Sequence, residues 1–176
     1  MEFKDLVKIR QSDRGFLDKV VEHEKLVLIA EAGRLSPSAC NSQPWLFHIV
    51  ESPEKVKQIA LDAQVLEMNP FLKTAKAFII IEEVFAKLMP GLAGLIDSQT
   101  FAKLDIGGTV NSICLQATDL GLGTCIIGMI DRRKIIKTLG LNNETKIVSF
   151  IAIGYAKDSK IRNKIRKDIS ETVKFY

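Results

Sequence analysis

The stretch DIGGTVNSICLQATDLGLGTCIIGM, residues 105–129, predicts one long buried helix, a glycine break and a short apolar strand. Its apolar residues recur at helical spacing on more than one face, so the helix needs neighbours on more than one side. Asp105 is placed to act as the N-cap, and Gly121 is placed to end the helix in a left-handed turn. After the break, residues 124–127 are β-branched or apolar and predict a buried strand.

The glycines of this stretch do not form a dinucleotide-binding loop. Gly121, Gly123 and Gly128 lack the GxGxxG spacing, and the order here is helix, glycines, strand. A Rossmann loop requires strand, glycines, helix. Taken alone, the glycines predict a helix end and a tight connection.

Composition predicts an ordinary globular chain. Of its 176 residues, 47% are hydrophobic and 26% are charged, which suits a single domain over residues 1–176. The net charge of +4 comes without a basic stripe interleaved with aromatics, so no nucleic-acid partner is expected. The three cysteines form no CxxC pair, and reduced thiols in a cytoplasmic protein are the expectation.

No membrane partner is expected either. The most apolar long region, residues 75–96, is interrupted by acidic and basic residues and by Pro90. The first residues, MEFKDLVKIRQSD, lack the apolar core of a signal peptide. His23 and His48 have no metal-ligand spacing, so no metal site is predicted.

The rest of the chain alternates helical and extended patterns. Residues 85–104 predict a loop or short helices, and the charged tail from Lys157 predicts a solvated end. Apolar periodicity and caps predict helices at 2–9, 22–35, 54–66 and 131–139, and strands at 45–50, 77–81 and 146–155. Together these elements predict an α+β fold with a mixed, largely antiparallel central sheet surrounded by helices.

Two polar segments carry candidate binding residues. Residues 10–14, RQSDR, place two guanidiniums around a hydroxyl, which suits a phosphate, although cations at a solvated helix end are the structural alternative. Residues 36–43, SPSACNSQ, offer amides and hydroxyls to a polar planar ligand just before a strand, although ordinary turns use the same residues.

These pieces, taken in order, resemble the nitroreductase family of FMN-dependent oxidoreductases over nearly the whole chain. KIRQSDRGF is similar to the family's opening Arg-x-Ser-x-Arg/Lys-x-Phe, and SPSACNSQPWLFHIV to its Pro-Ser-x-x-Asn-x-Gln-Pro-Trp signature. The central helix with LGLGTC and the tail IRNKIRKDISETVKF match two further family segments.

The resemblance implies which residues contact FMN. Arg10, Ser12 and Arg14 are implied to bind the phosphate and approach the ring, with Arg14 the candidate positive charge near N1 and O2. The tail is implied to return to the phosphate with Lys164 and Arg166. The remaining implied contacts are Pro37, Ser38, Ala39 and Asn41 across a dimer interface, Asn69 near the flavin edge, and the backbone of Ile127, Gly128 and Met129 against the isoalloxazine.

The implied activity is hydride transfer from NAD(P)H through bound FMN to an electron-poor acceptor, such as a nitroaromatic or a quinone, in a ping-pong cycle. FMN carries the chemistry, so no catalytic acid or base is assigned. The implied assembly is a homodimer with FMN at the interface. A non-catalytic flavin-binding protein, or another flavin reaction of the dehalogenation type, remains the alternative.

Overall fold

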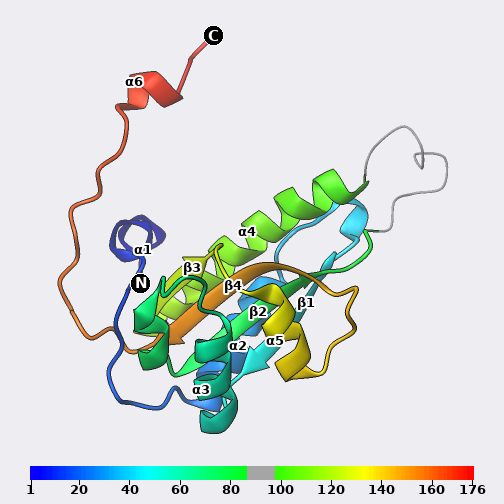
Figure 1. The fold of residues 1–176 in the computed structure, drawn as a ribbon. Coiled ribbons are helices and arrows are strands. Elements are labelled where there is room, and N and C mark those ends of the chain that lie inside the picture. Colours follow the sequence, from blue (N-terminus) through cyan, green and yellow to red (C-terminus); the bar gives the residue numbers. More distant parts are fainter. Residues whose placement is uncertain (87–97) are drawn as a thin grey trace.

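A four-stranded antiparallel sheet forms the centre of the fold (Figure 1) in the computed structural model, which describes residues 1–86 and 98–176. The strand order is β1-β2-β4-β3. The strands are β1 (Trp45–Val50), β2 (Ala77–Glu83), β3 (Gly123–Ile127) and β4 (Lys146–Gly154). The helices are α1 (Phe3–Ile9), α2 (His23–Arg34), α3 (Pro53–Asp62), α4 (Ser98–Asp119), α5 (Arg132–Leu139) and α6 (Ile169–Thr172), with short 3-10 turns η1 (Ala39–Asn41) and η2 (Pro70–Thr74). The α+β prediction is therefore confirmed.

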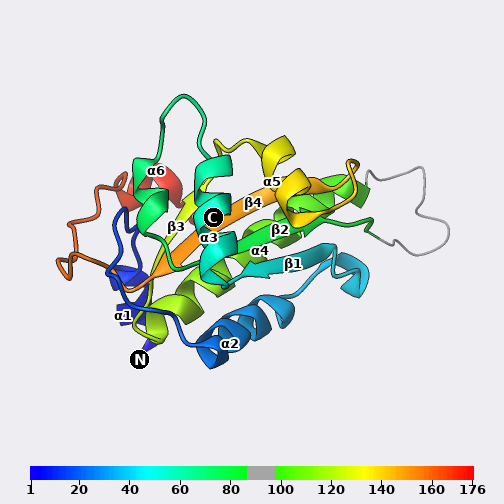
Figure 2. The same ribbon diagram turned by 60° about the horizontal axis from the view of Figure 1, so that its bottom comes forward.

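Helices cover both faces of the sheet because its two central strands are apolar on both faces. Alternate residues of β2 and β4 belong to different cores. Phe78 and Phe150, with ring centroids 4.8 Å apart, pack toward α3 and α5. Ile79 and Ile151 are paired in register and pack toward α2 and α4. Figure 2 shows α3 and α5 on one side of the strands and α4 on the other.

The long helix α4 begins earlier than the sequence pattern predicts. It starts at Ser98, so the prediction that Asp105 is its N-cap is wrong. Ala102 is fully buried one turn before Ile106, which extends the apolar face toward the N-terminus. Asp105 instead accepts a hydrogen bond of 3.0 Å from the backbone N–H of Ala39. Residues 98–104 are thus helical, and the rest of the predicted loop includes residues 87–97, outside the described part.

Other predicted boundaries hold more closely. Gly121 adopts φ of +77° after α4, and β3 follows as predicted. The helix predicted over 54–66 ends at Asp62, because Leu66 is 88% exposed and gains no core contact. The sequence pattern missed α6, whose first turn is fixed by a capping box between Asp168 and Glu171. Among the described residues, no helix combines the length and the apolar character needed to cross a bilayer.

A close approach at Gly154 attaches the N-terminal segment to the sheet. A Cβ at Gly154 would lie 2.9 Å from the ring of Phe16, which is buried and bridges to Ala156. We expect Gly154→Ala to lower the free energy of unfolding by about 1–3 kcal/mol, because the ring would have to move within a packed core. Urea denaturation measures the loss.

The double variant Phe16→Leu/Gly154→Ala tests the cause. We expect it to lose less than the sum of the two single losses, by on the order of 1 kcal/mol, because the smaller side chain makes room for the methyl group. Strict additivity would contradict the proposed contact.

Candidate functional site

The segment carrying Arg10, Ser12 and Arg14 lies along the outer edge of β3. Ser12 forms a parallel bridge with Thr124, and the backbone N–H of Asp13 donates to the Thr124 carbonyl at 2.8 Å. Gly123 permits this contact, since a Cβ there would lie 2.6 Å from Oδ2 of Asp13. The edge strand therefore fixes the backbone of this segment.

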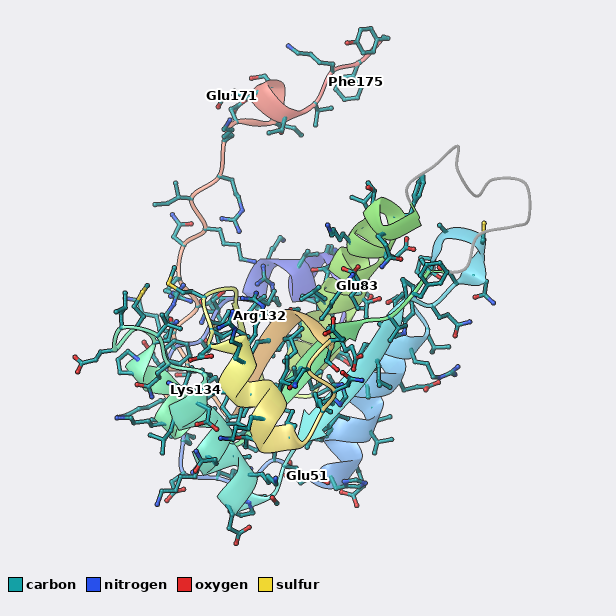
Figure 3. The ribbon with its side chains drawn as sticks, turned by 45° about the vertical axis from the view of Figure 1, so that its right-hand side comes forward. Glu51, Glu83, Arg132, Lys134, Glu171 and Phe175 are labelled. Carbon is teal, nitrogen blue, oxygen red and sulfur yellow. The ribbon has the colours of Figure 1, made fainter. Side chains whose placement is uncertain are left out.

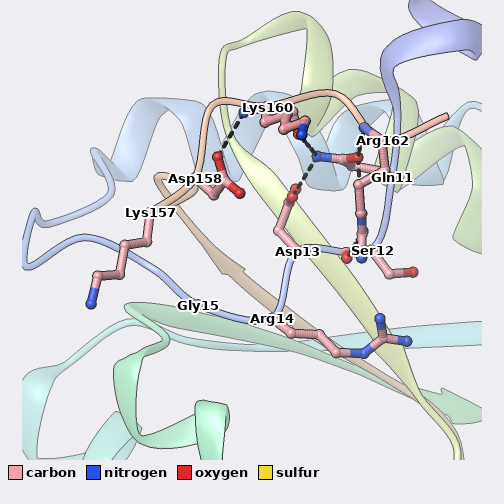
Figure 4. Close-up of a pocket in the computed structure, with 9 residues that line it drawn as sticks. All are labelled: Gln11, Ser12, Asp13, Arg14, Gly15, Lys157, Asp158, Lys160 and Arg162. Atoms are coloured by element: carbon pink, nitrogen blue, oxygen red, sulfur yellow. Dashed lines mark hydrogen bonds between the residues drawn. The ribbon is translucent and has the colours of Figure 1, made fainter.

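The C-terminal tail returns to the same place, and Gln11 joins the two segments. The side-chain oxygen of Gln11 accepts from the backbone N–H of Arg162 at 3.0 Å and from its Nε at 3.2 Å. The amide nitrogen of Gln11 donates to the Lys160 carbonyl and to Asp13, each at 3.1 Å. Arg162 also donates to the carbonyl of Ser12. Figure 4 shows Gln11 between Asp13 and the tail.

Between the two segments lies a cavity of about 350 Å³ whose charged lining residues are all cations. No carboxylate of residues 1–86 or 98–176 lines it. The guanidiniums of Arg10 and Arg14 make no hydrogen bond within the part of the chain that the structure describes. The five cations that line the cavity are Arg10, Arg14, Arg162, Lys164 and Arg166.

Because these cations lie close together, each raises the free energy of the charged form of the others. Burial, together with the positive charges of Arg10 and Arg166, lowers the pKa of Lys164. A bound anion would offset this repulsion and accept hydrogen bonds from several guanidiniums. The residues present therefore fit a phosphate group, and the structure brings together the five predicted residues Arg10, Ser12, Arg14, Lys164 and Arg166.

The acidic residue of the segment is turned away from this cavity. Asp13 lines a neighbouring cavity of about 480 Å³, and Figure 4 shows its side chain and that of Arg14 projecting to different sides. Burial raises the pKa of Asp13, and the Gln11 hydrogen bond and the charge of Arg162 oppose that shift. The carboxylate thus leaves the cations available for an external anion.

Ile127, Gly128 and Met129 form the other end of the same edge strand. Gly128 lies four positions after Thr124, a distance of about 13 Å in an extended chain. Ile127 is buried, Met129 is 53% exposed, and a Cβ at Gly128 would meet nothing within 4 Å. The backbone at the strand end is therefore open to a flat ligand.

The predicted residues of the 36–43 segment, between α2 and β1, lie away from the cation-lined cavity. They flank or form η1, which precedes β1, and β1 is at the opposite edge of the sheet from β3. Figures 1 and 2 both show this separation. The Ser38 hydroxyl accepts from the backbone N–H of Gln43 at 2.9 Å. Within one chain, the structure does not bring Pro37, Ser38, Ala39 and Asn41 to the cationic cavity.

Asn69 is also outside the cationic cavity. It takes a left-handed conformation with φ of 59° just before η2. That turn contacts the N-terminal segment through Thr74, whose hydroxyl accepts from the backbone N–H of Phe16 at 3.1 Å.

The sequence analysis missed Gln11 and Arg162. The alternation of Arg162, Lys164 and Arg166 is a signal for Arg162, because alternate residues of an extended segment share one side. No comparable signal marks Gln11, whose partners are 149 and 151 positions away.

Comparisons with known proteins identify related chains. The profile of the Nitroreductase family matches residues 7–68 and 56–155. The oxygen-insensitive NADPH nitroreductase of Helicobacter pylori is 30% identical over 172 residues, covering 80% of this chain and 81% of that protein.

Solved structures show the same fold. A nitroreductase family protein from Streptococcus pneumoniae superposes with a TM-score of 0.84 at 24% identity, over 99% of this chain and all of that one. An FMN-dependent nitroreductase from Clostridium difficile gives a TM-score of 0.76 at 26% identity, over 97% and 96% of the two chains.

Gln11→Leu tests the connection between the segments. We expect exchange of the Arg162 amide hydrogen to accelerate about fivefold or more, because each lost hydrogen bond contributes roughly 1 kcal/mol. Hydrogen exchange by mass spectrometry over residues 157–166 measures this. The control is Gln58→Leu on α3, where the glutamine side chain bonds, among the described residues, to Asp62 of its own helix alone. Unchanged exchange in Gln11→Leu would contradict the assigned role.

Proposed function

Because the chain belongs to the nitroreductase family, we propose that it is an FMN-dependent NAD(P)H oxidoreductase. The observation that carries this proposal is the cavity beside the beginning of β3, which is lined by five cations and, among the described residues, by no carboxylate. The names of the Helicobacter and Clostridium relatives support the reductant and the cofactor.

The cationic residues would hold the phosphate of FMN. Arg10 and Arg14 have guanidiniums available, and Ser12 adds a hydroxyl beside them. Gln11 holds the tail so that Lys164 and Arg166 reach the same cavity. The roughly 13 Å of β3 between the two regions suits the phosphate, the ribityl chain and the near part of the ring taken together, so the ring would lie against the backbone of residues 127–129.

The flavin, when bound, accepts a hydride from NAD(P)H and passes electrons to an acceptor. The chain's own contribution would be to bind and orient the flavin and to exclude water from it. Arg14 projects from a segment fixed on β3, and its positive charge would favour the anionic reduced ring. We propose a ping-pong cycle with a nitroaromatic or a quinone as acceptor.

We further propose that the protein is a homodimer with FMN at the interface. The residues of the 36–43 segment and the cationic cavity lie at opposite edges of one sheet, so a second copy is needed to bring one set to the other. Helix α4 offers a face for that copy. Its exposed stripe comprises Leu104, Gly108 and Asn111, at spacings of four and three residues, and the half-buried Leu115 follows four residues later.

Flavin binding tests the cofactor assignment. We expect Arg10→Gln to weaken FMN binding about 10- to 100-fold, because a charge-assisted hydrogen bond contributes about 1.5–3 kcal/mol. Riboflavin, which lacks the phosphate, should bind equally to both forms. Titration monitored by flavin fluorescence measures the dissociation constants, with Arg133→Gln on the exposed side of α5 as the control. Equal loss for both flavins would refute the phosphate assignment.

Anaerobic reduction separates the enzymatic proposal from its alternatives. We expect the absorbance of bound FMN to bleach on addition of NADH or NADPH, and a nitroaromatic or a quinone to restore it. Bound flavin that neither nicotinamide reduces would favour a non-catalytic flavin-binding protein. Reduced flavin that these acceptors fail to reoxidise would favour a dehalogenation-type reaction.

Gly108→Leu tests the dimer. A Cβ at Gly108 meets nothing within 4 Å in one chain, and leucine favours a helix over glycine by roughly 0.8 kcal/mol. An isolated chain should therefore tolerate the change. We expect the dimer to dissociate at concentrations at least tenfold higher than the unsubstituted protein, because the side chain occupies the approach surface. Light scattering measures the mass, and Lys137→Leu on α5 is the control.

A further inference from the structure

A third cavity, of about 460 Å³, lies beyond the end of β3, between β4 and α4. Pairing of β3 with β4 ends at Ile127 and Phe150, whereas β4 begins at Lys146. In the part of the chain that the structure describes, one edge of β4 therefore has no strand beside it at residues 146–149. The cavity is lined by Lys103, Ile106, Gly107, Val110, Arg132, Ile147, Val148 and Ser149.

Arg132 is fixed at this open edge. Its Nε donates to the Ile147 carbonyl at 2.8 Å, and its Nη2 donates to the Gly128 carbonyl at 3.1 Å. Nη1 has no hydrogen-bond partner among residues 1–86 and 98–176. Figure 3 shows Arg132 at the start of α5, beside the sheet. The guanidinium is thus held in place with donors to spare.

Among the described residues, the cavity is lined by a second cation and by no acidic residue. Lys103 shares a helix face with the apolar lining residues Ile106 and Val110, and it has no ion-pair partner in the described part of the chain. The hydroxyl of Ser149 is buried without a hydrogen-bond partner among the described residues. A Cβ at Gly107 would meet nothing within 4 Å, which leaves space between the walls.

We propose that this cavity binds the anionic group of an aromatic acceptor, and that an aromatic carboxylate is the preferred substrate class. The inference rests on the proposed function, because Arg132 bonds to Gly128, the residue placed against the flavin ring. A fixed guanidinium pairs with a carboxylate in a directional way. The apolar residues between the cations suit the flat ring that carries the carboxylate.

Binding of benzoate and benzamide tests the proposal without turnover. The two molecules have nearly the same shape and differ in charge, and titration of the FMN-loaded protein by ligand-detected NMR gives both dissociation constants. FMN occupies the cationic cavity near Arg10 during this measurement. We expect benzoate to bind on the order of tenfold more tightly than benzamide.

Two variants assign that preference to the cavity. We expect Lys103→Gln and Arg132→Gln each to reduce the benzoate preference severalfold, and Arg133→Gln, outside the cavity, to preserve it. Lys103→Gln is decisive because its side chain makes no hydrogen bond or ion pair in the described residues. A preference that survives in Lys103→Gln and Arg132→Gln, or is absent from the unsubstituted protein, would overturn the proposal.

Turnover then distinguishes this inference from the proposed function. The ratio of kcat/KM for 4-nitrobenzoate to that for 4-nitrobenzamide should follow the binding preference across the variants. If neither compound is reduced while benzoate binding depends on Lys103, the reductase proposal fails and the anion subsite stands. If Lys103→Gln weakens FMN and both acceptors equally, the cavity belongs to the flavin site and the subsite proposal fails.

Discussion

The edge strand β3 imposes the constraint on which the rest of the candidate site depends. One of its edges pairs with β4, and its other edge receives the backbone of Ser12 and Asp13. The strand also ends at Ile127, opposite Phe150, so the first four residues of β4, 146–149, extend beyond it. A cation-bearing segment is consequently fixed near the beginning of the strand, and an open backbone with a cavity beside it is left at the end. Two regions with different chemistry are thus positioned by one short element.

Neutral groups hold the cations together, and this preserves their charge for a ligand. The carbonyls of Ser12 and Val7 accept from Arg162 and Lys164, and Gln11 supplies an amide oxygen. A carboxylate in any of these places would neutralise a cation and compete with a phosphate. Burial, together with repulsion from Arg10 and Arg166, lowers the pKa of Lys164. A bound anion would offset this repulsion.

Local sequence patterns predicted most elements, because these depend on short-range periodicity. The break at Gly121 and the strand after it are examples. Motifs pointed to five residues that the structure brings to one cavity, and their role toward a phosphate stays a prediction. The N-terminus of α4 was predicted wrongly because Asp105 has the chemistry of a cap, while the deciding contact is the burial of Ala102. The role of Gln11 depends on chain return from residue 162, and one-dimensional spacing contains no trace of such a contact. The residues implied at the flavin itself remain predictions.

The separation of the two polar segments bears on the role of α4 in the proposed homodimer. Ala39 donates to Asp105 on α4, so the 36–43 segment is attached to the helix that also presents the exposed stripe around Gly108. A second copy packed on that stripe would meet the 36–43 turn, which the hydrogen bond to Asp105 attaches to α4. In the proposed homodimer, α4 would therefore act both as the core of each subunit and as the element that carries one subunit's turn toward the other's strand end. Within one chain the two polar segments lie at opposite edges of the sheet, so the proposed site would need two copies.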